Sequence, residues 1–191
     1  MTKRIIVING HSIKNSFCES IARSYIQGAK ESKAEIKFIN LYDLKFDPVF
    51  ISKKKQPLEK NLKHVQESIK WADHIVFVYP LWWGDMPALM KGFLDRAFIP
   101  GFAYDPKNKT MGLPKGLLKG KSARAIITMG APLPVYKLIF RKPATKIINI
   151  ALKYCGIKPV RTTHFGKIDS STEQTRKQIL SKVKHLGSKL Q

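Results

Sequence analysis

The sequence predicts a single α/β domain over residues 1–191, in which a doubly wound sheet of five parallel strands carries helices on both faces. Three observations support this class. Five short, β-branched apolar runs alternate with amphipathic stretches of helical length, which is the order that parallel sheets require. The third run is apolar almost throughout, as expected of a strand covered on both faces. The 191 residues, 43% of them hydrophobic, suffice for one core, and no repeat or Gly/Ser-rich linker divides them.

The first half of the chain supplies three of the predicted strands, at residues 4–9, 35–40 and 74–79. A helix is expected to begin after Ser16, because Ser16 and Glu19 have capping-box spacing and apolar residues then recur at helical intervals. Gly28 interrupts this pattern near its end. Two further helices are expected over 58–71 and 86–98, the second with Pro87 in its first turn.

The second half supplies the remaining elements. Residues 99–118 contain several Gly and Pro residues and are predicted to form a long loop, and such loops in compact domains tend to be functional. Strands are expected over 122–128 and 160–165, with a helix over 142–153 that ends before a C′ glycine, Gly156. Ser171 and Gln174 repeat the capping-box spacing and indicate the start of the last helix.

The charge balance is strongly basic, with 35 Lys plus Arg against 13 Asp plus Glu and a net charge of +22. The basic residues are spread along the chain, with modest clusters at 53–55, 115–121 and 137–146, which favours a solvated basic surface. Weak association with an anionic membrane surface stays open as an alternative. Nucleic acid is disfavoured as a partner, because no zinc-finger spacing, RNP-type aromatic motif or basic heptad segment accompanies the charge.

Two further features bear on the cellular compartment and on disulfide or metal sites. The apolar runs are too short to span a bilayer, and the four apolar residues near the start are too few for a signal peptide. Cys18 and Cys155 lack the spacing of metal ligands. We therefore expect a cytoplasmic protein with neither a disulfide framework nor a metal site.

Open α/β sheets bind ligands beyond the carboxyl ends of their strands, which directs attention to the loops after the first, third and fourth strands. The first loop, residues 10–17, opens a helix whose N–H groups suit an anion, with His11, Ser12, Asn15 and Ser16 as further donors. Gly10 is its only glycine, so it is neither a Walker loop nor a dinucleotide fingerprint. Taken alone, this loop favours the plainer interpretation, in which Ser16 is a helix cap and His11 a loop residue.

The other two loops point to a flat ring. Trp82 and Trp83 directly follow a buried strand and precede Gly84, an arrangement that suits a planar heteroaromatic ligand. The loop at 128–131 offers a hydroxyl group and unpaired amides opposite them. An anion site, an aromatic wall and a row of donors together predict a phosphorylated aromatic cofactor.

Residues 79–98, YPLWWGDMPALMKGFLDRAF, and their continuation at 99–104 resemble the signature of flavin-dependent NAD(P)H:quinone oxidoreductases of the DT-diaphorase type. The shorter segments 11–12, 16–17, 41–44 and 46–48 are similar to the N-terminal half of the same family. The similarity covers residues 3–130. It implies a flavodoxin-like fold, a tightly bound flavin and a homodimer with active sites at the subunit interface. It also implies two-step chemistry, in which NAD(P)H delivers a hydride to the flavin and a quinone or similar acceptor then takes two electrons.

The resemblance also implies roles for individual residues. The flavin phosphate end would be held by His11, Ser16 and Phe17. The isoalloxazine edge would be lined by Pro80, Leu81, Trp82 and Trp83, and its pyrimidine side would contact Thr128, Met129 and Gly130. Two tyrosines, Tyr104 near the partner subunit's pocket and Tyr136 beside the flavin, would be the catalytic residues.

Two departures and two alternatives accompany this resemblance. The chain has Met129-Gly130 where the family has a glycine pair, and Lys142 where the family has a histidine that assists charge balance. A lysine balances charge but is a poorer proton shuttle near neutral pH. The short chain favours FMN over FAD. The alternative to an enzyme is a regulatory flavoprotein subunit of a potassium-efflux transporter, a role that relatives of this fold also serve.

Overall fold

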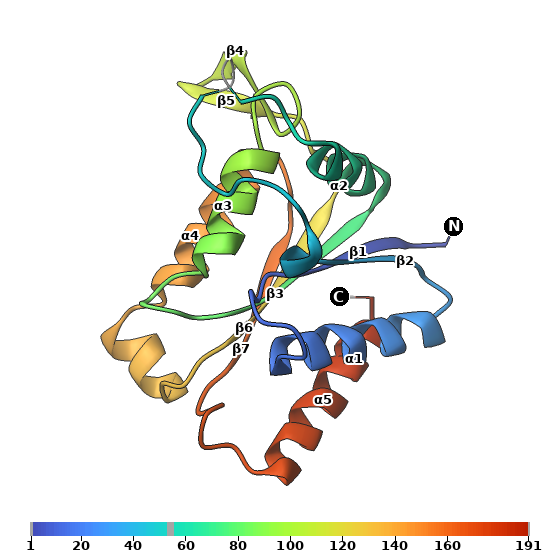
Figure 1. The fold of residues 1–191 in the computed structure, drawn as a ribbon, viewed down its shortest axis with the longest axis vertical. Coiled ribbons are helices and arrows are strands. Elements are labelled where there is room, and N and C mark those ends of the chain that lie inside the picture. Colours follow the sequence, from blue (N-terminus) through green and yellow to red (C-terminus); the bar gives the residue numbers. More distant parts are fainter. Residues whose placement is uncertain (1, 53–55, 191) are drawn as a thin grey trace.

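The computed structural model describes residues 2–52 and 56–190 and has the predicted architecture (Figure 1). Five strands form one sheet in the order β2-β1-β3-β6-β7, and every neighbouring pair is parallel. The strands are β1 (Arg4–Asn9), β2 (Glu35–Asn40), β3 (His74–Pro80), β6 (Ser122–Thr128) and β7 (Val160–Phe165), which agrees with the expected boundaries to within one residue. The chain winds outward from β1 in both directions, so the crevice expected of such sheets lies between β1 and β3.

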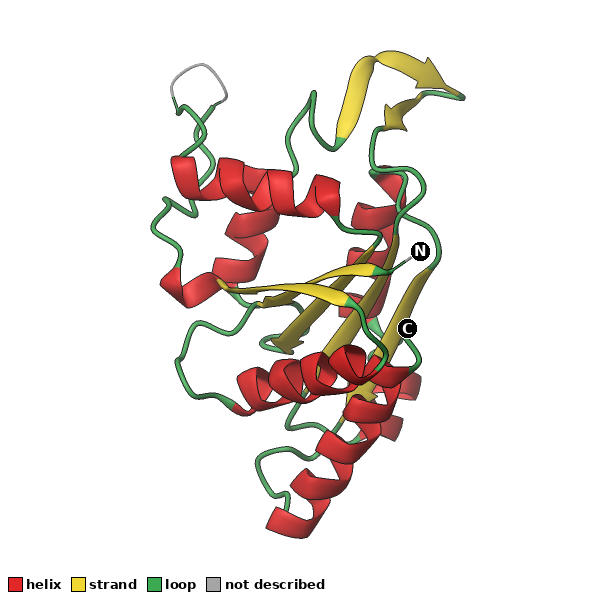
Figure 2. Cartoon of the chain, turned by 90° about the vertical axis from the view of Figure 1, so that its right-hand side faces the viewer, coloured by secondary structure: helices red, strands yellow, loops and turns green. Residues whose placement is uncertain are grey.

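Helices cover both faces of the sheet and make a three-layer sandwich (Figure 2). One core cluster joins the sheet to two helices, α1 (Phe17–Glu31) and α5 (Glu173–Ser188). The other core cluster joins it to α2 (Lys60–Trp71), α3 (Ala88–Ala97) and α4 (Pro143–Tyr154). Alternate residues of β1 serve the two layers, with Ile5 and Val7 in the first cluster and Ile6 and Ile8 in the second. The expected fold class is confirmed.

Helices α1 and α5 cross at two glycines. A Cβ on Gly28 would lie 1.9 Å from the carbonyl oxygen of Lys184, and one on Gly187 would lie 2.1 Å from the carbonyl oxygen of Tyr25. Both contacts are with backbone, which cannot move aside as a side chain can. Gly28 therefore permits the close approach of the two helices, and α1 continues past it to Glu31.

The segment expected to be one long loop contains an antiparallel hairpin outside the main sheet, formed by β4 (Tyr104–Thr110) and β5 (Leu113–Gly116). Its turn residues at Met111 and Gly112 have positive φ, so the glycine content that indicated a loop marks a tight turn instead. Two short elements were also not expected: a 3-10 turn, η1 (Leu41–Asp43), and a π-helical turn, η2 (Val135–Ile139).

Helix ends agree closely with expectation. Gly156 follows α4 with φ +89°, as a C′ glycine should, whereas the cap of α5 is Thr172 rather than Ser171. The hydroxyl oxygen of Thr172 accepts a hydrogen bond from the amide of Thr175. The basic cluster expected at 53–55 lies outside the described residues.

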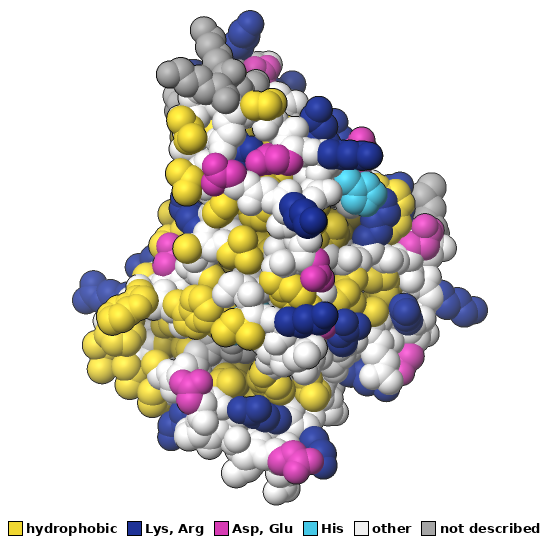
Figure 3. Space-filling view, in the orientation of Figure 1, with side chains coloured by type: hydrophobic (Ala, Val, Ile, Leu, Met, Phe, Trp, Pro, Cys, Tyr) yellow, Lys and Arg dark blue, Asp and Glu magenta, His cyan; other side chains and the backbone are white. Residues whose placement is uncertain are grey.

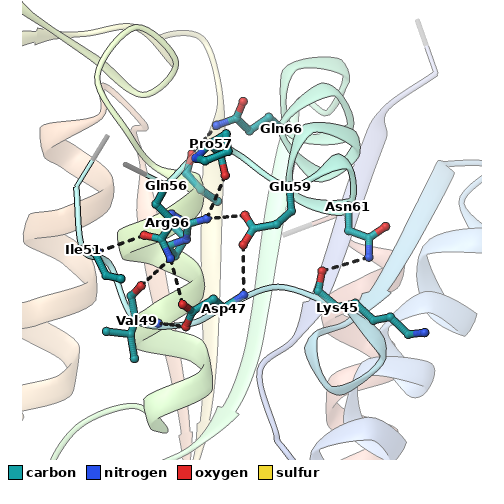
Figure 4. Close-up of polar contacts among 11 residues, drawn as sticks. Lys45, Asp47, Val49, Ile51, Gln56, Pro57, Glu59, Asn61, Gln66 and Arg96 are labelled. Atoms are coloured by element: carbon teal, nitrogen blue, oxygen red, sulfur yellow. Dashed lines mark hydrogen bonds and ion pairs between the residues drawn. The ribbon is translucent and has the colours of Figure 1, made fainter. Parts of the chain in front are cut away.

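The segment between η1 and α2 is anchored by an ion pair between a buried arginine and a partly exposed glutamate (Figure 4). Arg96 of α3 is only 2% exposed and pairs with the carboxylate of Glu59. The other oxygen of Glu59 accepts from the amide of Asp47 at 3.1 Å, and the Gln56 side chain donates to the Asp47 carboxylate and the Val49 carbonyl. These contacts hold the segment against α3.

Candidate functional site

The carboxyl ends of β1, β3 and β6 converge on a cleft of about 180 Å³, which we call the strand-end cleft. Eight of the ten residues predicted to bind a cofactor line it: His11, Phe17, Pro80, Leu81, Trp82, Thr128, Met129 and Gly130. The remaining lining residues are Cys18, Ile168 and Asp169, which sequence reasoning missed. Cys18 is the second residue of α1. Ile168 and Asp169 follow β7, so considering the loop after that strand as well would have predicted these two.

The amino terminus of α1 forms one wall of the cleft. Ser16 caps the helix, with its hydroxyl oxygen accepting from the amide of Glu19 at 3.3 Å. The first N–H groups of a helix have no partner within it, and together with the helix dipole they favour an anion. The amides that open α1, including those of Phe17 and Cys18, are therefore suited to a phosphate group.

Beside this wall lies a buried carboxylate whose negative charge is balanced by a neighbouring arginine. Glu19 is 4% exposed, and burial raises its pKa. Hydrogen bonds from Arg23, Tyr42 and the amide of Asn15 outweigh burial and lower the pKa below its ordinary value. The acid is therefore ionised, but its charge is balanced by Arg23 at 2.7 Å, so the helix terminus stays favourable to an anion.

An aromatic wall faces that terminus. The rings of His11 and Trp82 meet edge to face, with centroids 5.3 Å apart, and Trp82 is 40% exposed. Its backbone is fixed by reciprocal hydrogen bonds with Asp85, at 2.8 and 3.0 Å. Burial lowers the pKa of His11, which favours a neutral imidazole here. Trp83 has φ 51° and a fully exposed side chain, and it does not line the cleft.

The loop after β6 supplies fewer free amides than the sequence predicted. The amide of Met129 donates to the carbonyl of Phe165 at 2.9 Å, and the amide of Leu81 donates to that of Thr128 at 2.7 Å. Parallel pairing thus continues past the strand ends and occupies the amide of Met129, which corrects the expected row of unpaired amides at that residue. The Thr128 hydroxyl lies 3.2 Å from the sulfur of Cys18. A Cβ on Gly130 would lie 2.2 Å from a carboxylate oxygen of Asp169, so a small residue is needed there.

The two predicted catalytic tyrosines lie outside the cleft. Tyr136 is fully buried, and its hydroxyl oxygen accepts from the amide of Thr145 at 3.2 Å. The Thr145 hydroxyl in turn lies 2.7 Å from Nε2 of His164, whose ring is 5.3 Å from that of Tyr136. Burial, with Lys137 and Lys142 nearby, lowers the pKa of His164. Tyr136 is therefore packed below the surface in this conformation, not over the cleft.

Tyr104 lies in a larger, separate cavity of about 840 Å³, which we call the lateral cavity. It is formed by the anchored segment after η1 together with α3 and α4, and its apolar lining includes Val49, Phe50, Leu89, Phe98 and Tyr154. Although this cavity is larger than the strand-end cleft, we do not assign the reaction to it, because it lies away from the strand ends and carries few polar groups. Tyr104 and Tyr154 meet edge to face there, with centroids 5.1 Å apart.

The strand-end cleft suits a flat ring that carries a phosphorylated arm. The α1 terminus suits the anionic end, His11 and Trp82 provide an aromatic wall, and Gly130 forms the third side, where it lies against the Asp169 carboxylate. A flavin has this combination of parts, so the residues present fit the cofactor that the resemblance implies.

Comparisons with known proteins agree with the fold. A family described as having a flavodoxin-like fold matches residues 3–190. An NAD(P)H oxidoreductase of Haemophilus influenzae is 33% identical over 187 residues, which cover 94% of this chain and 91% of that protein. A ribosyldihydronicotinamide dehydrogenase (quinone) of Mus musculus is 25% identical, covering 94% of this chain and 88% of its own length. A Bacillus anthracis FMN-dependent NADH-azoreductase, solved with FMN, shares the fold with a TM-score of 0.77 and 19% identity, over 98% of this chain and 99% of that one.

Proposed function

We propose that this chain, which belongs to the flavodoxin-like fold family, is an NAD(P)H oxidoreductase that binds FMN and reduces a quinone or a similar small acceptor. The strand-end cleft carries the proposal, because it combines a helix terminus, an aromatic wall and a glycine at one crevice. The names of the two relatives, one an NAD(P)H oxidoreductase and one acting with a quinone, support the same activity. They favour an enzyme over a transporter subunit, which we do not propose.

FMN is the flavin we propose. The terminal phosphate of FMN would lie at the amino terminus of α1, where the free N–H groups of the first helical turn favour an anion. Ser16 and Phe17 would hold that end, whereas His11, whose ring lies against Trp82, would face the flavin ring instead of the phosphate. The FMN complex of the structurally similar azoreductase supports this choice.

When bound, the flavin supplies the chemistry of accepting a hydride from NAD(P)H and passing two electrons to an acceptor. This chain contributes position and electrostatics. Trp82 and His11 would support the ring, while the Thr128 hydroxyl and the Gly130 amide would face its polar edge, where donors stabilise developing negative charge. Trp82 is partly exposed, so the nicotinamide and the acceptor would reach the site in turn from the solvent side.

The two tyrosines receive different proposed roles. Tyr136 would act as a positioning residue, because its hydroxyl holds the start of α4 through Thr145. Tyr104, in the lateral cavity, would contribute to the site of a neighbouring copy. Lys142 is exposed and outside the cleft lining, so we assign no proton transfer to it.

A homodimer is part of the proposal. Large apolar side chains gather on the side of the molecule where η2 and α4 lie (Figure 3), and these include Leu138, Ile139, Phe140 and Ile150, each more than half exposed. The lateral cavity adjoins α4, and Trp83 is also fully exposed. A second copy would cover this surface, because neighbouring exposed apolar side chains commonly mark a protein–protein contact. Light scattering should give the mass of two chains for the wild type. The variant Ile150→Glu should give the mass of one chain.

We also propose the cytoplasm as the compartment, which the two free, buried cysteines support. Within the described residues no helix is long and apolar enough to cross a membrane. Association with an anionic membrane surface stays a prediction.

The test is to identify what the purified protein carries and what it reduces. Cofactor released by heat and weighed by mass spectrometry should be FMN, close to one per chain. The loaded protein should oxidise NADH or NADPH when a naphthoquinone is added. A protein that carries no flavin, and takes up neither FMN nor FAD on incubation, would overturn the proposal.

A further inference from the structure

A second pocket lies at the opposite end of the sheet from the strand-end cleft. Its volume is about 320 Å³, and we call it the basic pocket. It is lined where β1, β3, β6 and β7 begin and where α5 ends, by Lys3, His74, Ser122, Arg161, Lys189 and Leu190, with Ala123 and Pro159. Because parallel strands all start at the same edge, these residues are far from the proposed flavin site.

The charged groups that line this pocket are all positive. Lys3, Arg161 and Lys189 supply three cations, and no acidic residue is among the lining residues described. Burial lowers the pKa of Lys3, and Arg161 lowers it further. The nearby carboxylate of Asp73 acts in the opposite direction, but it is paired with Arg4 at 2.9 Å. Several positive charges therefore lie close together in a partly enclosed space. A bound anion would reduce the repulsion between them.

A buried histidine forms the floor of the pocket. His74 is 3% exposed, and its Nδ1 lies 2.7 Å from the hydroxyl of Ser122. Its Nε2 is buried without a hydrogen-bond partner among the described residues. Burial, followed by Lys3, Arg124 and Arg161, lowers the pKa of His74 to about 3, so the ring is neutral and retains one N–H. When Ser122 donates to Nδ1, that N–H is on Nε2 and lacks an acceptor.

A further arginine stands behind the floor. Arg124 is 6% exposed, donates to the Thr163 hydroxyl at 2.6 Å and leaves its Nε without a partner among the described residues. It pairs in register with Arg161 across β6 and β7. The two arginines therefore lie side by side on neighbouring strands. Together they extend the positive potential beneath the pocket.

We propose that the basic pocket binds a phosphate group, either free phosphate or a phosphomonoester. Three cations at the rim match a dianion better than a single carboxylate, and charge-assisted contacts from lysine and arginine are the ones phosphate oxygens favour. With Ser122 donating to Nδ1, the Nε2–H of His74 is a donor for a phosphate oxygen and has no other acceptor among the described residues. A volume of about 320 Å³ leaves room for an organic group beyond the phosphate itself.

Titration calorimetry on the flavin-loaded protein, in a buffer free of phosphate, tests the proposal with inorganic phosphate and with glycerol phosphate as probes. We expect saturable binding of at least one probe and a loss of about tenfold or more in affinity for Arg161→Gln, because one charge-assisted contact is removed. Arg161 is exposed, so this variant should fold. Lys63→Gln is the matched control: it also removes one positive charge, from an exposed position on α2, across the sheet from α5, and should change affinity less than twofold.

The ring of His74 gives an independent signal. On saturation with the probe, its nitrogen resonances should shift and its pKa should rise, while the nitrogen resonances of exposed His64 should not move. Tighter binding of glycerol phosphate would identify a phosphomonoester as the ligand, and equal or tighter binding of phosphate would identify the free ion. Absence of saturable binding at millimolar probe would overturn the proposal. Equal losses in Arg161→Gln and Lys63→Gln would also overturn it, because binding would then reflect overall net charge.

Discussion

Replacing His74 should make the protein less sensitive to acid. The ring is buried at the start of β3, bonded to Ser122 and surrounded by Lys3, Arg124 and Arg161, with Lys189 also at the pocket. These groups hold the pKa of His74 at about 3, against 6.5 for an ordinary histidine. Between those two values the unfolded chain binds a proton that the folded chain does not. The stabilisation is therefore complete above about pH 6.5 and is lost progressively as the pH falls toward 3.

The size of the effect follows from this difference in pKa. At pH 4.5 the unfolded histidine is almost fully protonated and the folded one almost fully neutral. Lowering the pH from 7 to 4.5 should then cost about 2–3 kcal/mol of unfolding free energy through His74 alone, at 1.36 kcal/mol for each unit. The variant His74→Asn would retain a side-chain oxygen or nitrogen near Ser122 but would not titrate.

Urea unfolding at both pH values, for wild type and His74→Asn, measures this contribution. Other titrating groups contribute equally to the two proteins, so they cancel in the difference between the two pH dependences. We expect the wild type to lose about 2–3 kcal/mol more than the variant between pH 7 and 4.5. Equal losses in the two proteins would refute the reasoning, because His74 would then have an ordinary pKa in the folded state.

Three further predictions concern the cleft and the packing. Trp82→Ala should weaken FMN binding about tenfold by fluorescence titration, whereas Trp82→Phe, which keeps an aromatic face, should stay within about threefold. Equal affinities for all three proteins would remove Trp82 from the wall. Gly28→Ala should gain about 1 kcal/mol of helix propensity but lose more by clashing with the Lys184 carbonyl, so its urea midpoint should fall, and a raised midpoint would contradict the close crossing. Glu59→Gln should cost about 1–3 kcal/mol of unfolding free energy, because the buried Arg96 loses its charged partner while the amide oxygen can still accept from it, and no loss of stability would show that the pair does not hold this segment in solution.

The strands and the cleft could be predicted because both depend on local pattern. Five apolar runs of strand length indicate the sheet, and the rule that ligands bind beyond strand ends is enough to bring His11, Trp82 and Thr128 together. Helix α1 is predicted from the spacing of Ser16 and Glu19. In each of these cases the information lies within a few consecutive residues.

The rest depends on pairing between distant segments. The amides of Leu81 and Met129 are occupied by strands that the sequence does not align residue by residue. Glycine-rich residues after α3 indicate a loop until their partners are known, so the β4–β5 hairpin was missed. The basic pocket was also missed, because Lys3, Arg161 and Lys189 come from distant parts of the chain and meet only where several elements start or end.

The most direct test of the proposed function is an absorption spectrum of the purified protein under anaerobic conditions, before and after NADPH and then a quinone. The account predicts flavin bands near their usual positions that bleach when NADPH is added and return when one equivalent of quinone follows. Flavin bands that stay unchanged with both NADPH and NADH would contradict it, because a flavin held at the strand-end cleft would then be out of reach of the nicotinamide.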